Sequence, residues 1–300
     1  SEEQPLPAFV SNPCANFTRF YTSPAWLDFK LWEKGAWYLF PEIDKAAIFD
    51  NGTCLVGYPQ ATTDQTTGET RYLKENIRKN QEQIARFSER DAATATTLFE
   101  KYRGEWRDAF MEQRLNPPTP WGQKDPIEKL FDSKDGIDPR WQYMTVREVA
   151  YDLFESIELR LLYMRSMLSS NGCFPDDVAP VSEIVSQLST TLSWSPSTVA
   201  KGGTHNIAHA LQKALTELGG DFFVQSEVDK ILIENGRTKG VHLTDGSEIE
   251  ATRAVVSGIN VTQTFFRLVG KGYISSDLAR KIENFSYDRA NDDGYRSRCR

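Results

Sequence analysis

Apolar residues recur at helical spacing over two long stretches in the middle of the chain. Ser88 followed by Asp91 forms a capping-box signature, and the apolar positions from Ala92 to Phe110 then follow one face of a helix. A second such signature, at Thr145 and Glu148, opens another apolar face. The pattern predicts one amphipathic helix after each signature and therefore a largely helical middle.

Short apolar runs typical of strands lie on either side of this helical middle. AAIFD and CLVGY are joined by the turn dipeptide Asn51-Gly52 and predict a hairpin. Later, VDKILIE and GVHL are joined by Asn235-Gly236, and Asp245-Gly246 turns the chain again. FFV and AVVSG predict two more strands, the second a short buried strand of the parallel-sheet kind.

A helix is predicted just before these later strands. Thr204 is its expected N-cap, and Gly219-Gly220 supplies a left-handed stop at its far end. The glycine pair Gly202-Gly203 precedes it. From residue 201 to 258 the predicted order is helix, strand, hairpin meander and strand, with the helix packed on the sheet.

Composition limits the classes of protein to consider. The chain has 300 residues, of which 39% are hydrophobic, so one large or two ordinary domains can form a core. Its 42 acidic and 35 basic residues give a net charge of −7 without any basic block, which makes nucleic acid a poor candidate partner. No apolar run approaches the length that crosses a bilayer.

Cysteine usage bears on the cellular compartment. The cysteines are widely separated, with no CxxC, which predicts reduced thiols and a cytoplasmic location: Cys14, Cys54, Cys173 and Cys299. N-x-S/T sequons argue weakly the other way, at Asn16, Asn51, Asn260 and Asn284. An organelle matrix and the periphery of a membrane are the alternatives.

The ordered motifs after residue 200 resemble a known family. GG, helix, LGG, SEVDKI, NGRTKGV, DGSEIEA and AVVSG are similar to the second segment of the FAD-binding domain in flavin oxidoreductases of the phytoene (carotenoid) desaturase type, relatives of the amine oxidases. SEEQPLPAF and IARFSERDA resemble that family less sharply. The resemblance implies a mixed α/β (α+β) fold, with a partial Rossmann-like FAD-binding domain and a largely helical substrate domain.

Four segments are expected on this basis. Residues 1–72 begin the substrate and FAD region and contain the hairpin, 73–198 form the helical substrate domain, 199–270 return to the FAD-binding domain, and 271–300 are an incomplete tail. The family's dinucleotide fingerprint GxGxxG is absent from the sequence, and the ending RANDDGYRSRCR matches nothing in the family. We therefore expect an internal piece of a longer flavoprotein.

The resemblance implies FAD as cofactor and five residues that contact it. Val228 corresponds to the residue whose backbone meets the adenine, since a strand edge offers both an N–H and a C=O. Ser257 and Gly258 would lie at the carboxyl edge of the parallel sheet, and Gly202 and Gly203 would bring backbone close to the flavin or the substrate. Each assignment has an alternative without a cofactor. Val228 would be a core strand residue, Ser257 and Gly258 would form a turn after a strand, and Gly202 and Gly203 would only break the chain before the helix.

The implied activity is a FAD-dependent desaturase or dehydrogenase that transfers hydride from an apolar small molecule to flavin. The cofactor carries out the difficult step, so no catalytic side chain is assigned. A non-catalytic protein that binds hydrophobic ligands or partners, without the nucleotide-binding half, is the alternative. Aromatic and methionine residues of the helical middle are candidates for lining a substrate channel or for simple core packing: Trp106, Phe110, Phe154, Met164 and Met167.

Two further possibilities are weighed from the residues. His205 and His209 stand four apart on one predicted helix, but the glutamate of HExxH is missing, so no metal site is expected. Peripheral membrane contact would suit an apolar substrate, although the sequence contains no basic amphipathic helix. No oligomeric state follows from the sequence.

Overall fold

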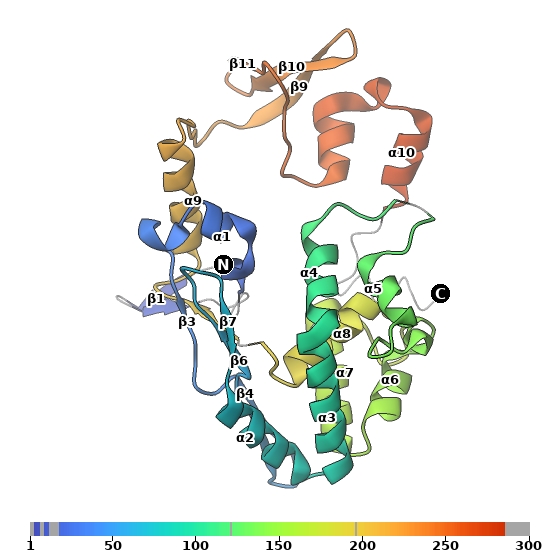
Figure 1. Cartoon of the computed structure of the whole chain (residues 1–300). Helices are drawn as coiled ribbons and strands as arrows, with labels where there is room; N and C mark the ends of the chain where they lie inside the picture. Colours follow the sequence, from blue (N-terminus) through green and yellow to red (C-terminus); the bar gives the residue numbers. More distant parts are fainter. Residues whose placement is uncertain (1–2, 7–8, 12–17, 121, 196, 286–300) are drawn as a thin grey trace. The chain divides into compact units, whose positions relative to one another are not determined.

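The computed structural model of the chain describes residues 3–6, 9–11, 18–120, 122–195 and 197–285 (Figure 1). The chain forms two compact units, Ser1–Leu218 and Gly219–Arg300. The four expected segments, with boundaries near residues 72, 198 and 270, remain a prediction. Several predicted features lie outside the described residues: the thiols of Cys14 and Cys299, the sequon at Asn16 and the tail after Phe285.

Among its described residues, the first unit contains four antiparallel strand pairs. The pair β4–β5 is the predicted hairpin, in which Ile48 pairs with Cys54 across Asn51-Gly52. The pair β3–β8 brings Tyr38 beside Ala200, so segments far apart in sequence meet. The strands are β1 (Glu3–Leu6), β2 (Phe9–Ser11), β3 (Tyr38–Leu39), β4 (Lys45–Ile48), β5 (Cys54–Gly57), β6 (Ala61–Thr63), β7 (Thr70–Tyr72) and β8 (Val199–Ala200).

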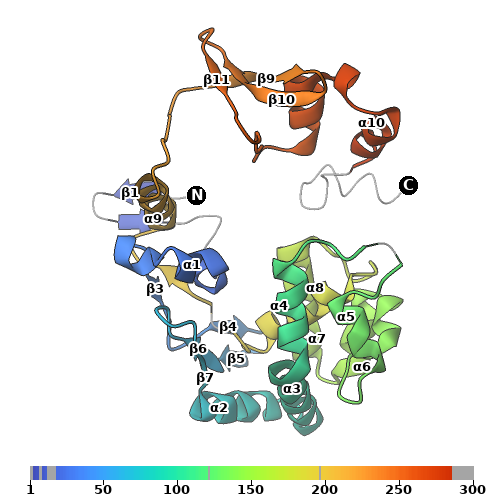
Figure 2. The ribbon, with the colours of Figure 1, turned by 45° about the horizontal axis from the view of Figure 1, so that its top comes forward.

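Helices make up the rest of this unit, and Figure 2 shows α4, α7 and α8 running close together. Contacts between α2 and α3, α6 and α7, and α7 and α8 join them in sequence order. The helical elements are η1 (Phe20–Thr22), α1 (Pro24–Asp28), η2 (Leu31–Lys34), α2 (Lys74–Ala85), α3 (Glu89–Lys101), η3 (Tyr102–Trp106), α4 (Arg107–Leu115), α5 (Pro126–Lys129), η4 (Leu130–Asp132), η5 (Pro139–Gln142), α6 (Val146–Leu153), α7 (Ile157–Asn171), α8 (Val181–Thr191) and α9 (His205–Glu217).

Both predicted capping residues begin helices. Thr145 and Glu148 form the complete reciprocal capping box at α6. Ser88 accepts a hydrogen bond from the Asp91 N–H at 3.0 Å, as expected at the start of α3. The Asp91 carboxylate does not accept the reciprocal hydrogen bond from the Ser88 N–H. It is fully buried and binds residues just after α6 instead.

The apolar face predicted after Thr145 is divided between α6 and α7. Phe154 is extended, with φ −123° and ψ 144°. The Asp91 carboxylate accepts from the N–H groups of Glu155 and Ser156 at 2.8 and 2.9 Å. A buried carboxylate at these positions satisfies donors that a continuous helix would direct to its own carbonyls, which accounts for the break.

The second unit is built on a three-stranded antiparallel sheet of order β11-β10-β9. The turn between β9 and β10 has positive φ at both Asn235 and Gly236, as a tight hairpin requires, and Gly246 at φ 89° turns β10 into β11. Both predicted turns are confirmed. The elements are β9 (Val228–Glu234), β10 (Arg237–Leu243), β11 (Glu248–Glu250), η6 (Gln263–Gly270), η7 (Lys271–Tyr273) and α10 (Ser276–Glu283).

Two predicted strands are wrong. Residues 222–224 and 254–258 are irregular, and within them Phe223 is 67% and Val256 92% exposed. A buried parallel strand needs neighbours on both edges and cover on both faces, and neither run pairs with the antiparallel sheet of the described residues. The mixed α/β character is confirmed, whereas the parallel sheet is absent from the described part of the chain.

The helix α9 belongs to the first unit rather than to this sheet. Ala210 and Ala214 are buried against a small core that contains Trp26, Leu31 and Tyr38. Within the first unit, α9 packs on η2, and the expected packing of this helix on the later strands stays a prediction. Gly219, at φ 82°, ends the helix as predicted.

Candidate functional site

A cavity of about 430 Å³ lies inside the first unit, and we call it the aromatic cavity. Its walls come from η1 and α1, from β6 and β7, from α4, and from the segment around α8. Five aromatic side chains line it: Tyr21, Tyr72, Tyr102, Phe110 and Trp194. An adjoining depression of about 960 Å³ shares Arg19, Met111 and Arg114 with it and reaches Thr204 at the start of α9.

Edge-to-face and tilted ring contacts hold the aromatic walls in place. The rings of Tyr102 and Trp194 lie 4.7 Å apart between centroids, and those of Tyr72 and Phe99 lie 5.8 Å apart at 82°. Trp194 and Phe99 are each 1% exposed. Tyr72, Tyr102 and Trp194 are thus packed in the main core and provide a rigid apolar surface.

A kink in the long helix α3–η3–α4 shapes one side of the cavity. Gly104 has φ −79° and ψ −109°, which is not helical, within the π-helical turn η3. Such turns redirect side chains and recur at functional sites. Tyr102, before the kink, and Arg107 and Phe110, after it, all line the aromatic cavity.

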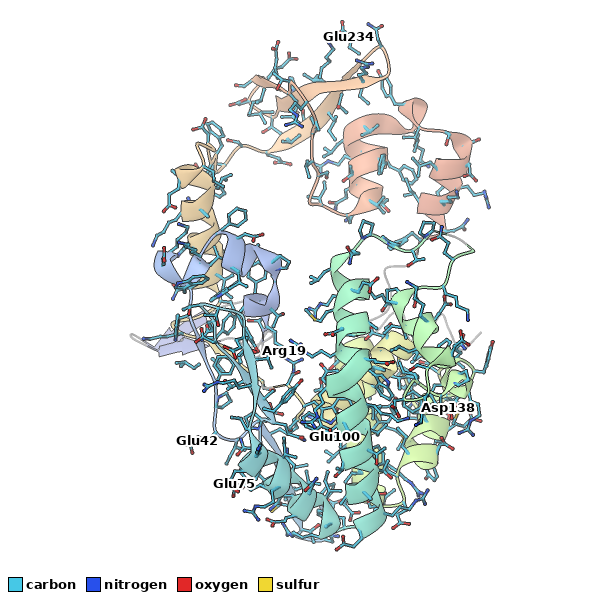
Figure 3. The ribbon with its side chains drawn as sticks, viewed as in Figure 1. Arg19, Glu42, Glu75, Glu100, Asp138 and Glu234 are labelled. Carbon is cyan, nitrogen blue, oxygen red and sulfur yellow. The ribbon has the colours of Figure 1, made fainter. Side chains whose placement is uncertain are left out.

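Three arginines lie on the cavity walls. The Arg107 Nη2 donates to Thr70 Oγ1 at 3.3 Å, and the Arg19 Nη2 donates to the Ser195 carbonyl at 3.5 Å. Arg114 is exposed and has no ion pair among the described residues. In Figure 3, Arg19 projects from the strand-rich part on the side that faces α4.

Tyr21 and Tyr72 of the cavity are held in their neutral form. Burial raises the pKa of Tyr21 to about 12, against the opposing effects of Arg19 and of a hydrogen bond with Thr198. Burial also raises the pKa of Tyr72, while Arg107 works in the opposite direction. At neutral pH these two phenols therefore carry no negative charge.

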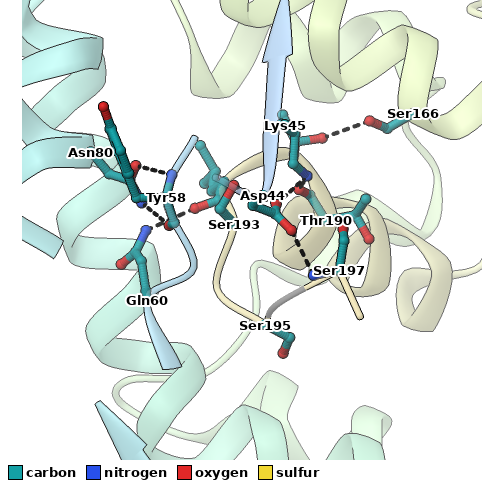
Figure 4. A network of polar contacts seen from close by, with 12 residues as sticks. Asp44, Lys45, Tyr58, Gln60, Asn80, Ser166, Thr190, Ser193, Ser195 and Ser197 are labelled. Atoms are coloured by element: carbon teal, nitrogen blue, oxygen red, sulfur yellow. Dashed lines mark hydrogen bonds and ion pairs between the residues drawn. The ribbon is translucent and has the colours of Figure 1, made fainter. Parts of the chain in front are cut away.

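A buried polar network braces the segment after α8 against the hairpin β4–β5 (Figure 4). Asp44 accepts from Ser193 Oγ at 2.7 Å and from the Ser197 N–H at 2.6 Å, and its carboxylate lies 3.0 Å from Lys45 Nζ. Lys45 also donates to the Thr190 carbonyl. The network fixes both ends of the segment that carries Trp194 and Ser195 into the cavity wall.

The charges in this network are matched. Burial is the largest influence on the Asp44 carboxyl and favours its neutral form, but Lys45 and the hydrogen bonds from Ser197 and Ser193 outweigh it and lower the pKa. Burial lowers the pKa of Lys45, and Asp44 opposes that shift. We interpret the pair as a positioning element rather than a reactive one.

Val228 is the first residue of β9, the edge strand of its sheet. It is half-buried and pairs with Leu243 on one side. The opposite edge of β9 has no partner strand among the described residues, so this main chain fits the requirement for meeting an adenine edge. Its role as a cofactor residue stays a prediction.

Ser257 and Gly258 lie in the exposed, irregular segment before η6. The Ser257 hydroxyl is 2.7 Å from that of Thr264. A Cβ added at Gly258 would meet no atom within 4 Å, so nothing in the described part of the second unit requires a glycine there. Their contact with FAD stays a prediction, without the parallel sheet that suggested it.

Gly202 and Gly203 form a tight turn directly before α9. Both have positive φ, 72° and 99°, and a Cβ at Gly202 would come within 2.7 Å of the Asn206 amide. Turn geometry alone explains the pair. Thr204 follows them at the helix start but makes no side-chain capping bond to the helix, and it borders the adjoining depression.

One of the five proposed channel residues lines the aromatic cavity, namely Phe110. Trp106, Phe154 and Met167 are core residues with 0–1% exposure, and Met164 packs partly buried against the same core. Sequence reasoning missed the arginines and most of the aromatic walls. The aromatic-rich opening of the chain was the available signal for Tyr21.

The two histidines of α9 stack on each other, with centroids 5.6 Å apart and an interplanar angle of 15°. Both are exposed. Within the described ranges, no group of three or more His, Cys, Asp or Glu side chains is arranged to hold a metal ion. Over the same ranges, no helix has the length and apolar character needed to cross a membrane.

Comparisons with known proteins find partial similarities to carotenoid desaturases and to an isomerase. The chain is 37% identical over 87 residues to a 4,4'-diapophytoene desaturase of Methylomonas sp, covering 29% of this chain and 17% of that protein. It is 39% identical over 71 residues to a neurosporene-forming phytoene desaturase of Rhodobacter capsulatus, covering 23% and 13%. A chloroplastic prolycopene isomerase of Daucus carota is 33% identical over 84 residues, covering 28% and 13%.

These similarities are partial. The matched stretches span between 13% and 18% of the length of the curated relatives. No family model matches the chain. Over roughly a quarter of its length, the chain is thus similar to carotenoid desaturases and to a carotenoid isomerase.

Proposed function

We propose that the chain is part of a FAD-dependent oxidoreductase that desaturates or dehydrogenates an apolar, carotenoid-like small molecule. The similarity to carotenoid desaturases carries the proposal. The aromatic cavity supports it, because its volume of about 430 Å³ and its mainly apolar walls are typical of small-molecule sites. A cytoplasmic location is part of the same proposal.

The residues of the chain fit such a cofactor in part. Val228 would meet the adenine through the open edge of β9, and Gly202 and Gly203 would bring backbone near the flavin. Ser257 and Gly258 complete the proposed set. When bound, FAD supplies the hydride acceptor for oxidation of a C–H bond.

The side chains of the first unit have a positioning role in this proposal. Tyr72, Tyr102 and Phe110 would hold the apolar substrate in one orientation and exclude water from it. No titratable group is assigned to the hydride step. The alternative of a non-catalytic binding protein has no support from the similarities, since the relatives described above are enzymes by name.

The test uses the native polypeptide, isolated from its source and supplied with FAD and an acyclic polyene such as phytoene. We expect a longer conjugated system in the product, measured by absorbance and mass. Phe110→Ala should raise KM about tenfold through lost apolar contact, whereas Phe174→Ala, outside the cavity and 37% exposed, should not. An unchanged polyene in the presence of bound flavin would count against the proposal, and a product of equal mass but altered double-bond geometry would indicate an isomerase.

A further inference from the structure

We infer that Gly104 is a positioning residue for the aromatic cavity: it permits the π-helical turn η3, and this turn fixes which side chains of α4 face the ligand. Tyr102 before the turn and Phe110 after it both line the cavity. The main chain at Gly104 is not helical and lies between α3 and α4. That the ligand is the substrate rests on the proposed function, whereas its binding is measured without turnover.

The hydrogen bonds of η3 enclose one residue more than an α-helical turn does. The Arg107 N–H donates to the Tyr102 carbonyl, five residues earlier. At the end of α3, by contrast, the Tyr102 N–H donates to the Leu98 carbonyl, four residues earlier. A hydrogen bond across five residues is the π-helical pattern. Gly104 lies in the middle of this turn, so the extra residue is accommodated where the chain departs from helical geometry.

The extra residue sets the direction of the side chains in α4. Successive residues of a regular α-helix are rotated by about 100°, so residues five apart point about 140° away from each other. Tyr102 and Arg107 are five apart, yet both line the aromatic cavity. From Arg107 onward, Phe110, Met111 and Arg114 follow at the spacing of one helical face and line it too. The face that α4 presents to the cavity therefore depends on the turn.

A regular helix through η3 would present a different face of α4. Ala109 would take the direction that Phe110 now has, because α4 would turn by about 100°. The Gln113 Nε2, which donates to the Asp125 carboxylate at 2.9 Å, would turn away from this partner. The cavity would then exchange an aromatic ring for a methyl group.

Glycine suits this turn because of its backbone rather than its size. Gly104 is exposed, and a Cβ at this position would meet no atom within 4 Å beyond its own helical backbone. Apart from proline, glycine is the weakest helix former. It therefore favours a departure from the regular helix that alanine would oppose, although alanine would fit the space.

The test is a fluorescence titration of the full chain with the methyl ester of cis-parinaric acid, an uncharged polyene. Gly104→Ala should weaken binding of the ester about three- to fivefold, which corresponds to the difference in helix propensity between the two residues. Deletion of Gly104 should change the affinity by less than about twofold, because it removes the extra residue and leaves Phe110 on the same face. Gly272→Ala is the matched control, since Gly272 is exposed in η7 and a Cβ there would meet no atom within 4 Å.

A second measurement separates positioning from a merely structural role. Phe110→Ala should weaken ester binding about tenfold in the unchanged protein but only about twofold in the Gly104→Ala background, where the ring is turned away. In the deletion background the tenfold cost should remain. Circular dichroism and thermal unfolding check the fold and the stability of every variant.

Unchanged ester binding in Gly104→Ala would overturn the inference, as would the full tenfold cost of Phe110→Ala in that background. If Gly104→Ala does not fold, the deletion variant decides: a folded deletion variant that loses the ester would contradict the inference. Equal losses in the two variants would contradict it too, and so would an unchanged protein that does not bind the ester.

The failure of this inference is distinguishable from that of the proposed function. Turnover of a polyene by Gly104→Ala with an unchanged KM would overturn the positioning role and keep the proposed function. A native protein without flavin, in which the ester titrations follow the expected pattern, would remove the proposed function and keep Gly104 as the residue that positions α4.

Discussion

The two units of the chain differ in how far their apolar residues are buried. In Ser1–Leu218, many of the large aromatic side chains are packed away, with Trp26 and Phe154 at 0% exposure, although Tyr143 is 79% exposed. In Gly219–Arg300, Phe223 is 67% and Val256 92% exposed. The first unit buries two clusters of apolar side chains, whereas the second presents apolar runs that have no partner strand among its described residues.

This difference separates two kinds of sequence signal. An amphipathic helix finds its partners among neighbouring helices, so its pattern alone predicts which residues are buried. A continuous apolar run predicts a strand only if other strands are present to pair with it. Residues 222–224 and 254–258 have the second kind of signal, and the described part of the second unit offers them no parallel neighbours.

The largest expected effect concerns the core of the first unit. Phe154→Ala should lower the free energy of unfolding by about 3–5 kcal/mol, because the fully buried ring would leave a cavity between α6 and α7. Leu161→Ala, 48% exposed on α7, should cost less than about 1 kcal/mol. Urea unfolding monitored by circular dichroism measures both. Equal losses of unfolding free energy in the two variants would contradict the difference in burial between Phe154 and Leu161.

The polar network is the next most sensitive feature. Asp44→Asn should destabilise the first unit by about 3 kcal/mol, since it leaves Lys45 without its counter-charge near the buried end of α8. Arg78→Gln, which removes exposed ion pairs of α2, should change stability by less than about 1 kcal/mol. Equal losses of stability in the two variants, measured by thermal unfolding, would contradict a bracing role for Asp44.

The pKa of Tyr21 predicts a loss of stability at alkaline pH. The folded state keeps this phenol protonated up to a pKa of about 12, whereas in the unfolded chain it ionises near 10. The unfolded state therefore releases its proton first, and stability falls between these two pH values. Tyr21→Phe should remove roughly 2–3 kcal/mol of this fall, measured as the difference between unfolding free energies at pH 9 and pH 12. If the unfolding free energy fell by the same amount between pH 9 and pH 12 in both proteins, Tyr21 would not be the group responsible.

The smallest effect is expected in the exposed runs of the second unit. Phe223→Ser should change the unfolding free energy by less than about 0.5 kcal/mol, because the ring is already in contact with water. Leu268→Ser, 7% exposed in η6, is the buried comparison and should cost at least about 2 kcal/mol. A large loss from Phe223→Ser would mean that the ring is covered in solution.

Local signals were the most predictable part of this chain. The Asn-Gly and Asp-Gly turns and the capping box at Thr145 depend on a few adjacent residues, and all are found in the structure. The break at Phe154 was not predictable in this way. It depends on Asp91, which lies more than sixty residues earlier and is brought to Glu155 by the fold.

The candidate site was less predictable for the same reason. Arg19 and Ser195 meet at the wall of the aromatic cavity although they are 176 residues apart in sequence. No periodicity marks an isolated arginine as a cavity residue. The resemblance in the sequence indicated the desaturase type of oxidoreductase, and the partial similarities to carotenoid desaturases agree with it. That resemblance was based mainly on the later third of the chain, however, and gave no information about this cavity.

The most direct test of the proposed function is the flavin spectrum of the native polypeptide during anaerobic mixing with a polyene substrate. We predict bound FAD whose absorbance bleaches as the polyene is oxidised, with weaker FAD binding in Val228→Pro, which removes the main-chain N–H at the edge of β9. A native protein that contains no flavin and does not take up added FAD would contradict the proposal.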